Sequence, residues 1–402
     1  MRICFYFVFL SCIFQHSSAQ MQICAQMDFP VKTTDSIRHS AKGISGKGKP
    51  VVGTFFGGHA GNWNFDATVT EANKSQYANG MVITKGLIPN IKPIWDVHMR
   101  DAVIILGGDG NYYLTGSTGD NIWKFNDGIE LYRSNDLKTW DYLGLVWSIE
   151  KDGGWEKKWR VNHDKPVRAI WAPELHYIRK NYYIVLSMPP GGISILKSTT
   201  GKAEGPYVHA TNPEKPLWGG IGPLPGSFLI DPTLFEDEDG KVYFTQGPAN
   251  FIVRMKDDLS DFAEQPHLIQ ITTPDTCANH HIKNCLANFK NKDLGFEGAT
   301  LFKRNGIYYL GSTDKFEDRY SMMISTSTHI SGPYSGRYEA VPCNGGTNFF
   351  KAKNGDWFTC FFGDDKQAPW REKPGIIKIE FDSSDKIQIA KNQPEFILNL
   401  NN

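Results

Sequence analysis

Three acidic residues each stand at the head of a similar stretch of sequence: Asp101 of "DAVIILGGDGNYYLTGS", Asp231 of "DPTLFEDEDGKVYFTQG" and Glu297 of "EGATLFKRNGIYYLGST". The stretches align without a gap, so we assign the three acids to one repeat position. Carboxyl groups that a fold gathers in a cleft repel one another and lose hydration, which raises some of their pKa values. Two carboxyls with separated pKa values can hydrolyse a glycosidic bond, because one protonates the leaving oxygen while the other activates water. A single acid of this kind would instead be explained as a turn cap or a ligand of a structural cation.

Two further copies extend the repeat: "GTNFFKAKNGDWFTCFF" from Gly346 and, with a turn one residue shorter, "APELHYIRKNYYIVLSM" from Ala172. In four copies an Asp-Gly or Asn-Gly pair lies eight residues after the first position. Such a pair between runs of β-branched and aromatic residues signals a hairpin, because two-residue type I′ turns need positive φ at both residues. Each copy therefore predicts a β-hairpin, and β-like runs such as 129–144 and 320–335 can add outer strands.

Five antiparallel sheets in tandem predict an all-β fold, a five-bladed β-propeller whose four-stranded blades surround a central channel. The innermost strand of a blade comes first and lines the channel, so equivalent positions of different blades face one another. We therefore expect Asp101, Asp231 and Glu297 to converge at one mouth of the channel. The alternative is a β-sandwich with coincidental hairpins, but a turn held at one offset in four copies argues against it.

The charge balance bears on the partners of the chain. Its 402 residues include 43 basic and 43 acidic side chains, so there is no excess positive charge for binding nucleic acid. Residues 1–19 have the layout of a signal peptide, which predicts a secreted or periplasmic protein. The apolar run there is too short for a membrane anchor, and no other segment predicts stable membrane insertion. We expect residues 20–402 to form a single propeller domain, with 20–90 as a lead-in that closes the ring.

Five cysteines remain if the signal peptide is removed: Cys24, Cys277, Cys285, Cys343 and Cys360. Cys277 and Cys285 bracket a polar loop and can form a disulfide in an oxidising compartment, with Cys343 and Cys360 as a second, weaker pair. The histidines between Cys277 and Cys285 also allow a metal site, although the spacing differs from that of common zinc modules.

Four blocks of the sequence resemble the signature blocks of glycoside hydrolase family 43: "MRDAVI", "WAPELHYIRKNYYIVLS", "IDPTLFEDEDGKVYF" and "GFEGATLFKRNGIYYLGS". The resemblance extends over about residues 90–390 and implies a five-bladed propeller that hydrolyses arabinofuranosides, xylosides or sometimes galactosides with inversion. By block, it implies that Asp101 is the general base and Glu297 the general acid. It implies that Asp231 modulates the pKa of the acid and orients it. The implied partner is a carbohydrate, such as a plant-type polysaccharide.

The sequence departs from the family pattern at two points. The first block reads Asp101-Ala102 where the family usually has Asp-Pro. Many relatives carry a histidine in the last blade that helps to hold a central cation, but this chain has Gly346-Thr347 there. We therefore expect no cofactor, and a central structural cation is doubtful.

Four more residues are candidates for substrate binding: Trp171, Trp123, Arg100 and His59. Trp171 precedes a channel-lining position and can stack on a sugar face, although core packing explains it equally well. Trp123 and His59 lie in loops that can wall subsites or simply anchor the loops. Arg100 can contact a neighbouring carboxylate or cover the rim. Two rival functions remain open, a carbohydrate-binding propeller without turnover and a retaining glycosidase or transfructosylase of related architecture.

Overall fold

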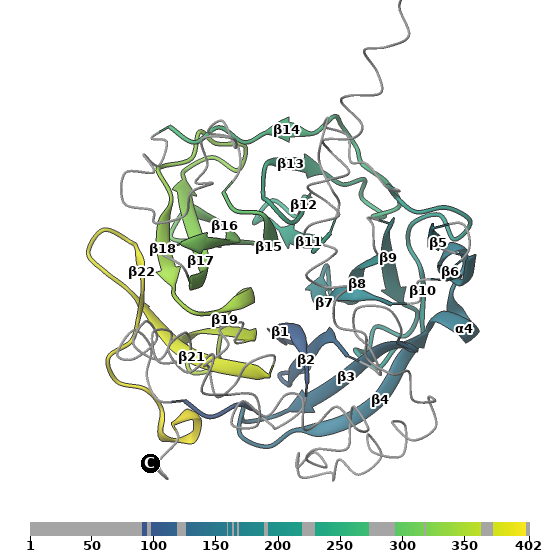
Figure 1. Ribbon diagram of the computed structural model, residues 1–402, viewed down its shortest axis with the longest axis horizontal. Helices are drawn as coiled ribbons and strands as arrows, with labels where there is room; N and C mark the ends of the chain where they lie inside the picture. The colour runs from purple at the N-terminus through teal and green to yellow at the C-terminus, as the bar shows by residue number, and fades with distance from the viewer. Residues whose placement is uncertain are drawn as a thin grey trace, which may run out of the picture.

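The computed structural model describes residues 91–94, 98–118, 126–158, 160–162, 165–166, 169–188, 192–218, 230–272, 294–316, 319–362 and 373–398. Within these ranges the strands form five four-stranded antiparallel sheets arranged in a ring (Figure 1), which confirms the five-bladed β-propeller. No helix in this part of the chain is long and apolar enough to cross a membrane. The signal peptide, the lead-in over 20–90, and the Cys277 to Cys285 loop lie outside the described residues.

In each blade the four strands lie side by side in chain order. Blade 1 contains β1 (Arg100–Leu106), β2 (Tyr112–Ser117), β3 (Gly128–Ser134) and β4 (Asp141–Ser148). Blade 2 contains β7 (Trp171–Ile178), β8 (Asn181–Met188), β9 (Gly192–Ser198) and β10 (Tyr207–His209). Blade 3 contains β11 (Thr233–Glu236), β12 (Val242–Thr245), β13 (Phe251–Arg254) and β14 (His267–Leu268).

The last two blades are built in the same way. Blade 4 contains β15 (Glu297–Arg304), β16 (Ile307–Phe316), β17 (Arg319–Ser327) and β18 (Tyr338–Val341). Blade 5 contains β19 (Gly345–Lys351), β20 (Trp357–Phe362), β21 (Pro374–Phe381) and β22 (Ile387–Ile389). The remaining elements are the short pair β5 (Arg160–Asn162) and β6 (Lys165–Pro166), the helix α4 (Ile149–Asp152), and the 3₁₀ turns η3 (Trp155–Lys158) and η5 (Glu395–Ile397).

The hydrophobic core lies between successive blades rather than at the channel. Because each sheet has a neighbour on both faces, inner strands such as β8 are buried along almost their whole length. The five interfaces are formed by Leu131, Trp147 and Leu186 between blades 1 and 2; Ile195, Leu234 and Phe244 between blades 2 and 3; Ile252, Leu301 and Leu310 between blades 3 and 4; Phe302, Tyr309 and Phe349 between blades 4 and 5; and Ile104, Leu114 and Phe358 between blades 5 and 1. The ring is therefore closed by packing of apolar sheet faces.

The first hairpins use two kinds of turn. In blades 2 and 4 the turns are two residues long with positive φ at both positions, Arg179-Lys180 and Asn305-Gly306. In blades 1, 3 and 5 only the glycine of each pair, Gly110, Gly240 or Gly355, is left-handed, and its N–H closes a turn three residues back. These are three-residue loops with a terminal left-handed glycine. The hairpins are confirmed, but the type I′ turn is wrong for three of the four Asp-Gly and Asn-Gly copies.

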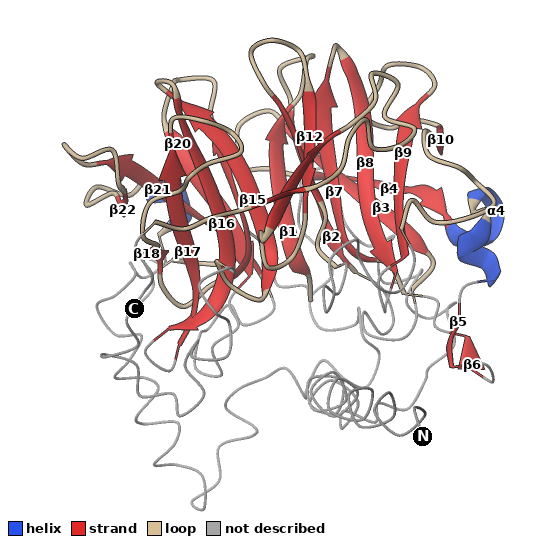
Figure 2. Ribbon diagram, turned by 90° about the horizontal axis from the view of Figure 1, so that it is seen from above, coloured by secondary structure: helices blue, strands red, loops and turns tan. Residues whose placement is uncertain are grey.

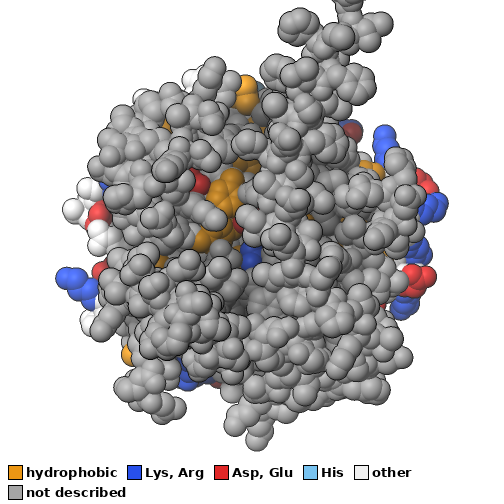
Figure 3. Space-filling model, viewed as in Figure 1, with side chains coloured by type: hydrophobic (Ala, Val, Ile, Leu, Met, Phe, Trp, Pro, Cys, Tyr) orange, Lys and Arg blue, Asp and Glu red, His pale blue; other side chains and the backbone are white. Residues whose placement is uncertain are grey.

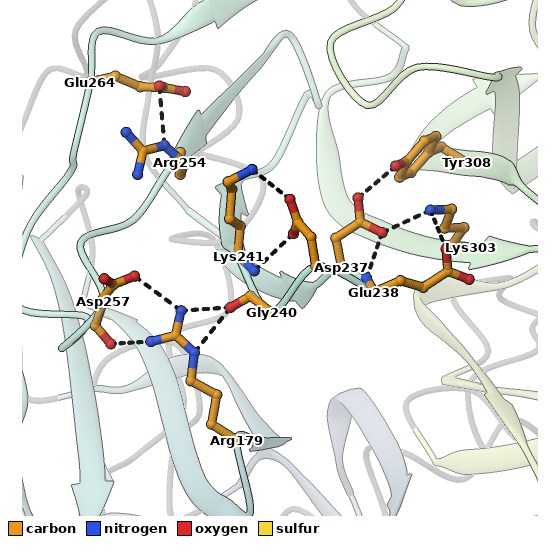
Figure 4. A network of polar contacts seen from close by, with 11 residues as sticks. Arg179, Asp237, Glu238, Gly240, Lys241, Arg254, Asp257, Glu264, Lys303 and Tyr308 are labelled. Atoms are coloured by element: carbon orange, nitrogen blue, oxygen red, sulfur yellow. Dashed lines mark hydrogen bonds and ion pairs between the residues drawn. The ribbon is translucent and has the colours of Figure 1, made fainter.

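The turns of these hairpins lie on one side of the ring, which we call the hairpin face, at the upper edge of Figure 2. There the blades are joined to their neighbours by polar contacts, two of which Figure 4 shows. Arg179 of blade 2 donates to the Gly240 carbonyl oxygen at 2.6 and 3.0 Å. Lys303 of blade 4 contacts Asp237 at 2.9 Å and Glu238 at 2.8 Å, both from blade 3.

One predicted disulfide is wrong. Among the described residues, Cys360 is a free thiol fully buried in β20, so it does not pair with Cys343. Burial raises the pKa of the Cys360 thiol, which therefore remains protonated and unreactive.

Candidate active site

The opposite side of the ring, which we call the acid face, is built by a bulge near the start of the first strand in blades 1, 2, 4 and 5, and by the corresponding residues just before β11 in blade 3. The pairing register skips at this point, for example between Arg100 and Val103 in β1. The residue at this position has positive φ in every blade; we call these the bulge residues, and they are Asp101, Ala172, Asp231, Gly298 and Gly346. The residues just before them are Arg100, Trp171, Ile230, Glu297 and Gly345. Aspartate adopts this backbone conformation more readily than most side chains, and such strained positions gather at functional sites.

The alignment predicted that Glu297 occupies the same position as Asp101 and Asp231, and this is wrong. Glu297 lies one residue earlier, and Gly298 takes the bulge position of blade 4. The cause is turn length, because the two-residue turn at Asn305 is one residue shorter than the corresponding turns of blades 1 and 3. Because the alignment matches the turns without a gap, the one-residue difference in turn length becomes a one-residue shift at the start of the strand.

Asp101 is held by a serine from the second strand of its own blade. The Oγ of Ser117 accepts a hydrogen bond from the Ala172 N–H at 2.8 Å and donates to Oδ2 of Asp101 at 2.6 Å. Because the amide occupies a serine lone pair, the hydroxyl proton is directed to the carboxylate. The carboxylate also needs space from blade 5, since a Cβ at Gly346 would lie 2.9 Å from Asp101 Oδ1.

Asp231 is held more directly. The position of Ser117 is taken by Gly247 in blade 3, which has no side chain to intervene. Oδ2 of Asp231 therefore accepts a hydrogen bond from the backbone N–H of Gly298 in blade 4 at 2.8 Å. In both blades the aspartate is tied to the bulge of the next blade, through Ser117 in one and directly in the other.

Glu297 receives a hydrogen bond from the hydroxyl of Tyr320, which lies in β17 of the same blade and donates to Oε1. The main-chain oxygen of Glu297 accepts from the Ser312 hydroxyl at 2.8 Å. Just ahead of the glutamate, Arg337 donates to the Leu294 carbonyl oxygen and to Asp314, both at 2.5 Å. These contacts fix the backbone and one carboxyl oxygen of Glu297.

The three acids interact electrostatically although they come from three blades. Burial raises the pKa of Asp231 well above its ordinary value, and the negative charges of Asp101 and Glu297 raise it further. The Gly298 N–H and the positive charge of Arg100 lower it by less. Asp101, Asp231 and Glu297 therefore share one site at the axis, as expected from the repeat, in spite of the shift at Glu297.

The predicted binding residues are partly within the described chain. Arg100 lies over the ring of Phe362 in blade 5, with its guanidinium carbon 4.2 Å from the ring centroid, and its charge reaches Asp231. Trp171 is partly exposed at the equivalent position of blade 2. Trp123 and His59 lie outside the described residues. Figure 3 looks onto the acid face, where hydrophobic, acidic and basic side chains of the described residues are visible near the axis.

The described residues do not fit a central cation. Gly346 occupies the last-blade position near the site, and a Cβ there would lie 2.7 Å from the Asp101 Cα, so no ligating side chain can be accommodated. Within the part of the chain that the structure describes, no three His, Cys, Asp or Glu side chains are grouped closely enough to hold a metal ion.

Two residues of the site, Ser117 and Tyr320, were missed by the reasoning from sequence. Ser117 ends its repeat copy at the position that Gly247 and Thr313 hold in other copies, so the alignment contained a usable signal. Tyr320 lies in a third strand with no aligned counterpart, and nothing in the repeat indicates it.

Residues 91–387 match the model of the glycosyl hydrolases family 43. The beta-D-galactofuranosidase xynD of Aspergillus niger is 28% identical over 224 residues, which cover 51% of this chain and 54% of that protein. A putative beta-xylosidase of Escherichia coli is 26% identical over 233 residues, which cover 56% of this chain and 38% of that protein. The chain thus spans about half or less of the length of these relatives.

Solved structures share the fold. An endo-1,4-beta-xylanase from Bacteroides thetaiotaomicron has a TM-score of 0.54 at 22% identity, covering 75% of this chain and 97% of that one. The GH43 protein BlXynB from Bacillus licheniformis has a TM-score of 0.55 at 20% identity, covering 77% of this chain and 60% of that one.

Proposed function

The chain belongs to the glycosyl hydrolases of family 43, and we propose that it hydrolyses arabinofuranosyl, xylosyl or related glycosidic bonds of plant-type polysaccharides by single-displacement inversion. The observation that carries the proposal is the meeting of Asp101, Asp231 and Glu297 at one end of the channel, where burial and the charges of the other two acids raise the pKa of Asp231. Relatives named beta-D-galactofuranosidase and beta-xylosidase support this class of substrate.

In the proposed reaction Glu297 is the general acid and Asp101 the general base. Glu297 transfers its proton to the glycosidic oxygen as the bond from that oxygen to the anomeric carbon breaks. Asp101 accepts a proton from a water molecule whose oxygen attacks the same carbon from the opposite face, so the anomeric configuration inverts. This route requires carboxyl groups roughly 6.5 to 9.5 Å apart, which leaves room for the water.

Asp231 is the proposed modulator of the acid. Its charge and that of Glu297 disfavour each other's ionised form, and the coupling acts in both directions. The hydrogen bond from Gly298, the residue after Glu297, also ties Asp231 to the backbone that carries the acid. Trp171 and Arg100 are proposed substrate contacts, and Trp123 and His59 are proposed walls of the subsites.

The matched variants Glu297→Gln and Asp101→Asn test the two roles. With a disaccharide, whose leaving group is poor, we expect each variant to lose about 10² to 10⁴ in kcat/KM. With an aryl glycoside, whose leaving group needs less protonation, Glu297→Gln keeps a larger share of its activity whereas Asp101→Asn does not. Arabinofuranosides, xylosides and galactosides are compared to identify the sugar.

Proton NMR of the first-formed product decides the stereochemistry. Inversion supports the single displacement, whereas retention would make Asp101 a nucleophile. If both variants fold and keep near-parental rates on the best substrate, the acids are not catalytic, and a carbohydrate-binding propeller becomes the better description.

We also propose that residues 1–19 direct export of the protein, based on their order of a basic residue, an apolar run and small residues. N-terminal sequencing of the protein from an extracellular or periplasmic fraction tests this, and a chain that begins with Met1 in that fraction contradicts it.

A further inference from the structure

Tyr320 is a buried tyrosine whose hydroxyl reaches the proposed general acid. Its side chain is 6% exposed, and the hydroxyl donates to Oε1 of Glu297. The ring is held between two others, with centroids 5.8 Å from Phe296 and 6.3 Å from Phe362. The hydroxyl therefore approaches Glu297 from a direction that packing fixes.

The space for this ring is provided by blade 5. Gly345 occupies the position before the bulge, where blades 1, 2 and 4 carry Arg100, Trp171 and Glu297. A Cβ at Gly345 would lie 2.0 Å from Cε1 of Tyr320 and 2.7 Å from Cζ of Phe362. A side chain in blade 5 would thus displace the tyrosine, so Gly345 and Tyr320 form one arrangement across the interface between the blades.

We propose that Tyr320 is a positioning residue for the general acid, an inference that rests on the proposed function. A protonated carboxyl has one hydroxyl oxygen and one carbonyl oxygen, and the carbonyl oxygen accepts hydrogen bonds. Because the Tyr320 hydroxyl donates to Oε1, the transferable proton is carried by Oε2. The tyrosine therefore selects which oxygen of Glu297 delivers the proton and holds the carboxyl in that rotamer.

The effect on pH dependence follows from the charges that face Glu297. Glu297 interacts with Asp231 of blade 3, which the charges of Asp101 and Arg100 of blade 1 also reach, and it accepts a hydrogen bond from the neutral Tyr320 hydroxyl. A donor stabilises the ionised carboxylate more than the neutral acid. Removal of the hydroxyl should therefore move the alkaline limb of the kcat/KM profile, which reports loss of the acid proton, upward by about 0.5 to 1 pH unit.

The test compares Tyr320→Phe with Tyr309→Phe in the full chain. Tyr309 lies in the same blade, but its hydroxyl donates to the Asp385 carbonyl oxygen on the hairpin face at 2.7 Å. For Tyr320→Phe we expect about a tenfold loss on a disaccharide, a loss of less than about threefold on an aryl glycoside with a good leaving group, and the upward shift of the alkaline limb. Tyr309→Phe should leave the pH profile and the ratio between the two substrates unchanged.

A second variant, Gly345→Ala, displaces the same ring without removing the hydroxyl from the sequence, and it should reproduce the substrate ratio and the pH shift of Tyr320→Phe. Equal losses on both substrates with an unmoved alkaline limb would overturn the inference and leave Tyr320 a structural residue. If Glu297→Gln retains activity, the proposed function fails; if Glu297→Gln is inactive while Tyr320→Phe behaves as the parent, only the role of Tyr320 fails.

Discussion

The two faces of the propeller are built from the same strands but arrange their charged side chains in opposite ways. On the hairpin face Lys303 lies between Asp237 and Glu238 of the preceding blade, so opposite charges are paired. On the acid face Asp231 lies near two other carboxylates, and burial and these charges raise its pKa. One face therefore gains stability from its polar groups, and the other places like charges together.

The hairpin face links every blade to the next. The five links are Tyr182 to Gly108 and Asp109, Arg179 to Gly240, Lys303 to Asp237, Arg304 to Asp385, and Lys353 to Tyr112 and Asn135. Together with the apolar cores between the sheets, these links join all five blades at the end opposite the acids. The difference between the faces shows that the acid face can carry unfavourable charge because the opposite end of each blade is fixed.

Among the substitutions that test this difference between the two faces, we expect the largest effect from Asp231→Asn, which removes one of the like charges on the acid face. The variant should lose about 10 to 100-fold in kcat/KM, because Glu297 loses its charged neighbour. It should also be more stable at pH 7, since an amide has nearly the same shape, can still accept from the Gly298 N–H, and carries no charge. A rise in Tm on the order of 2 to 4 °C corresponds to relief of about 1 kcal/mol.

The sign of the pH dependence follows from the raised pKa of Asp231. The folded protein binds this proton more tightly than the unfolded chain, so the resulting stability is fully present below the unfolded pKa of about 3.9 and is lost as pH rises towards the folded pKa. Thermal unfolding at pH 4 and pH 7 should therefore show the advantage of Asp231→Asn mainly at pH 7. A variant that is less stable than the parent at pH 7 would mean that the charge of Asp231 is compensated.

The matching change on the hairpin face, Asp237→Asn, should have the opposite pattern. The Asp237 side chain is 10% exposed and accepts from Tyr308 at 2.5 Å and from Lys303 at 2.9 Å. The loss of hydrogen bonds to a charged group should cost about 2 kcal/mol and lower Tm by about 4 °C or more, with kcat/KM unchanged well below Tm. Glu238→Gln is the control, because the Glu238 side chain is 81% exposed and its contribution should be small.

The pH dependence of Asp237 also has the opposite sign. Burial alone would raise its pKa, but the hydrogen bonds from Tyr308 and Lys303 outweigh burial and lower it. Its stabilisation is therefore present above the unfolded pKa and is lost as pH falls through the folded pKa. The difference in Tm between parent and Asp237→Asn should be large at pH 7 and shrink in acid; a constant difference would point to packing rather than charge.

The sequence was informative about the hairpin face because its signals are local. The glycine of each Asp-Gly or Asn-Gly pair, such as Gly110 or Gly306, must adopt positive φ, and the flanking β-formers follow directly. Blade number and the meeting of the acids could be predicted from the repeat. The alignment failed at Glu297 because turns of two and three residues have the same dipeptide signature, and their difference appears only in the strand register.

The remaining features of the acid face depend on contacts between blades. Tyr320 reaches Glu297 only because Gly345 of the next blade leaves space, and Ser117 holds Asp101 by accepting from Ala172 of blade 2. No local pattern in a single sequence encodes which residues meet across such an interface. The same limit applies to Cys360, which packs with apolar residues in the core between blades 5 and 1 and forms no disulfide.

The smallest effect is expected where the hairpin face is most exposed. Arg179 donates to backbone carbonyl oxygens of Gly240 and Asp257, and it also contacts the Asp257 carboxylate at 3.3 Å. The Asp257 side chain is 92% exposed, so Asp257→Ala should change stability by no more than about 0.5 kcal/mol, and less in high salt. Arg179→Ala removes the bonds to the carbonyl oxygens as well and should cost about 1 to 2 kcal/mol.

Denaturant unfolding of both variants at low and high salt distinguishes the two contributions. If Asp257→Ala costs as much as Asp237→Asn, exposed charge rather than hydrogen bonding to the backbone holds these blades together, and the contrast between the two faces would rest on electrostatics alone.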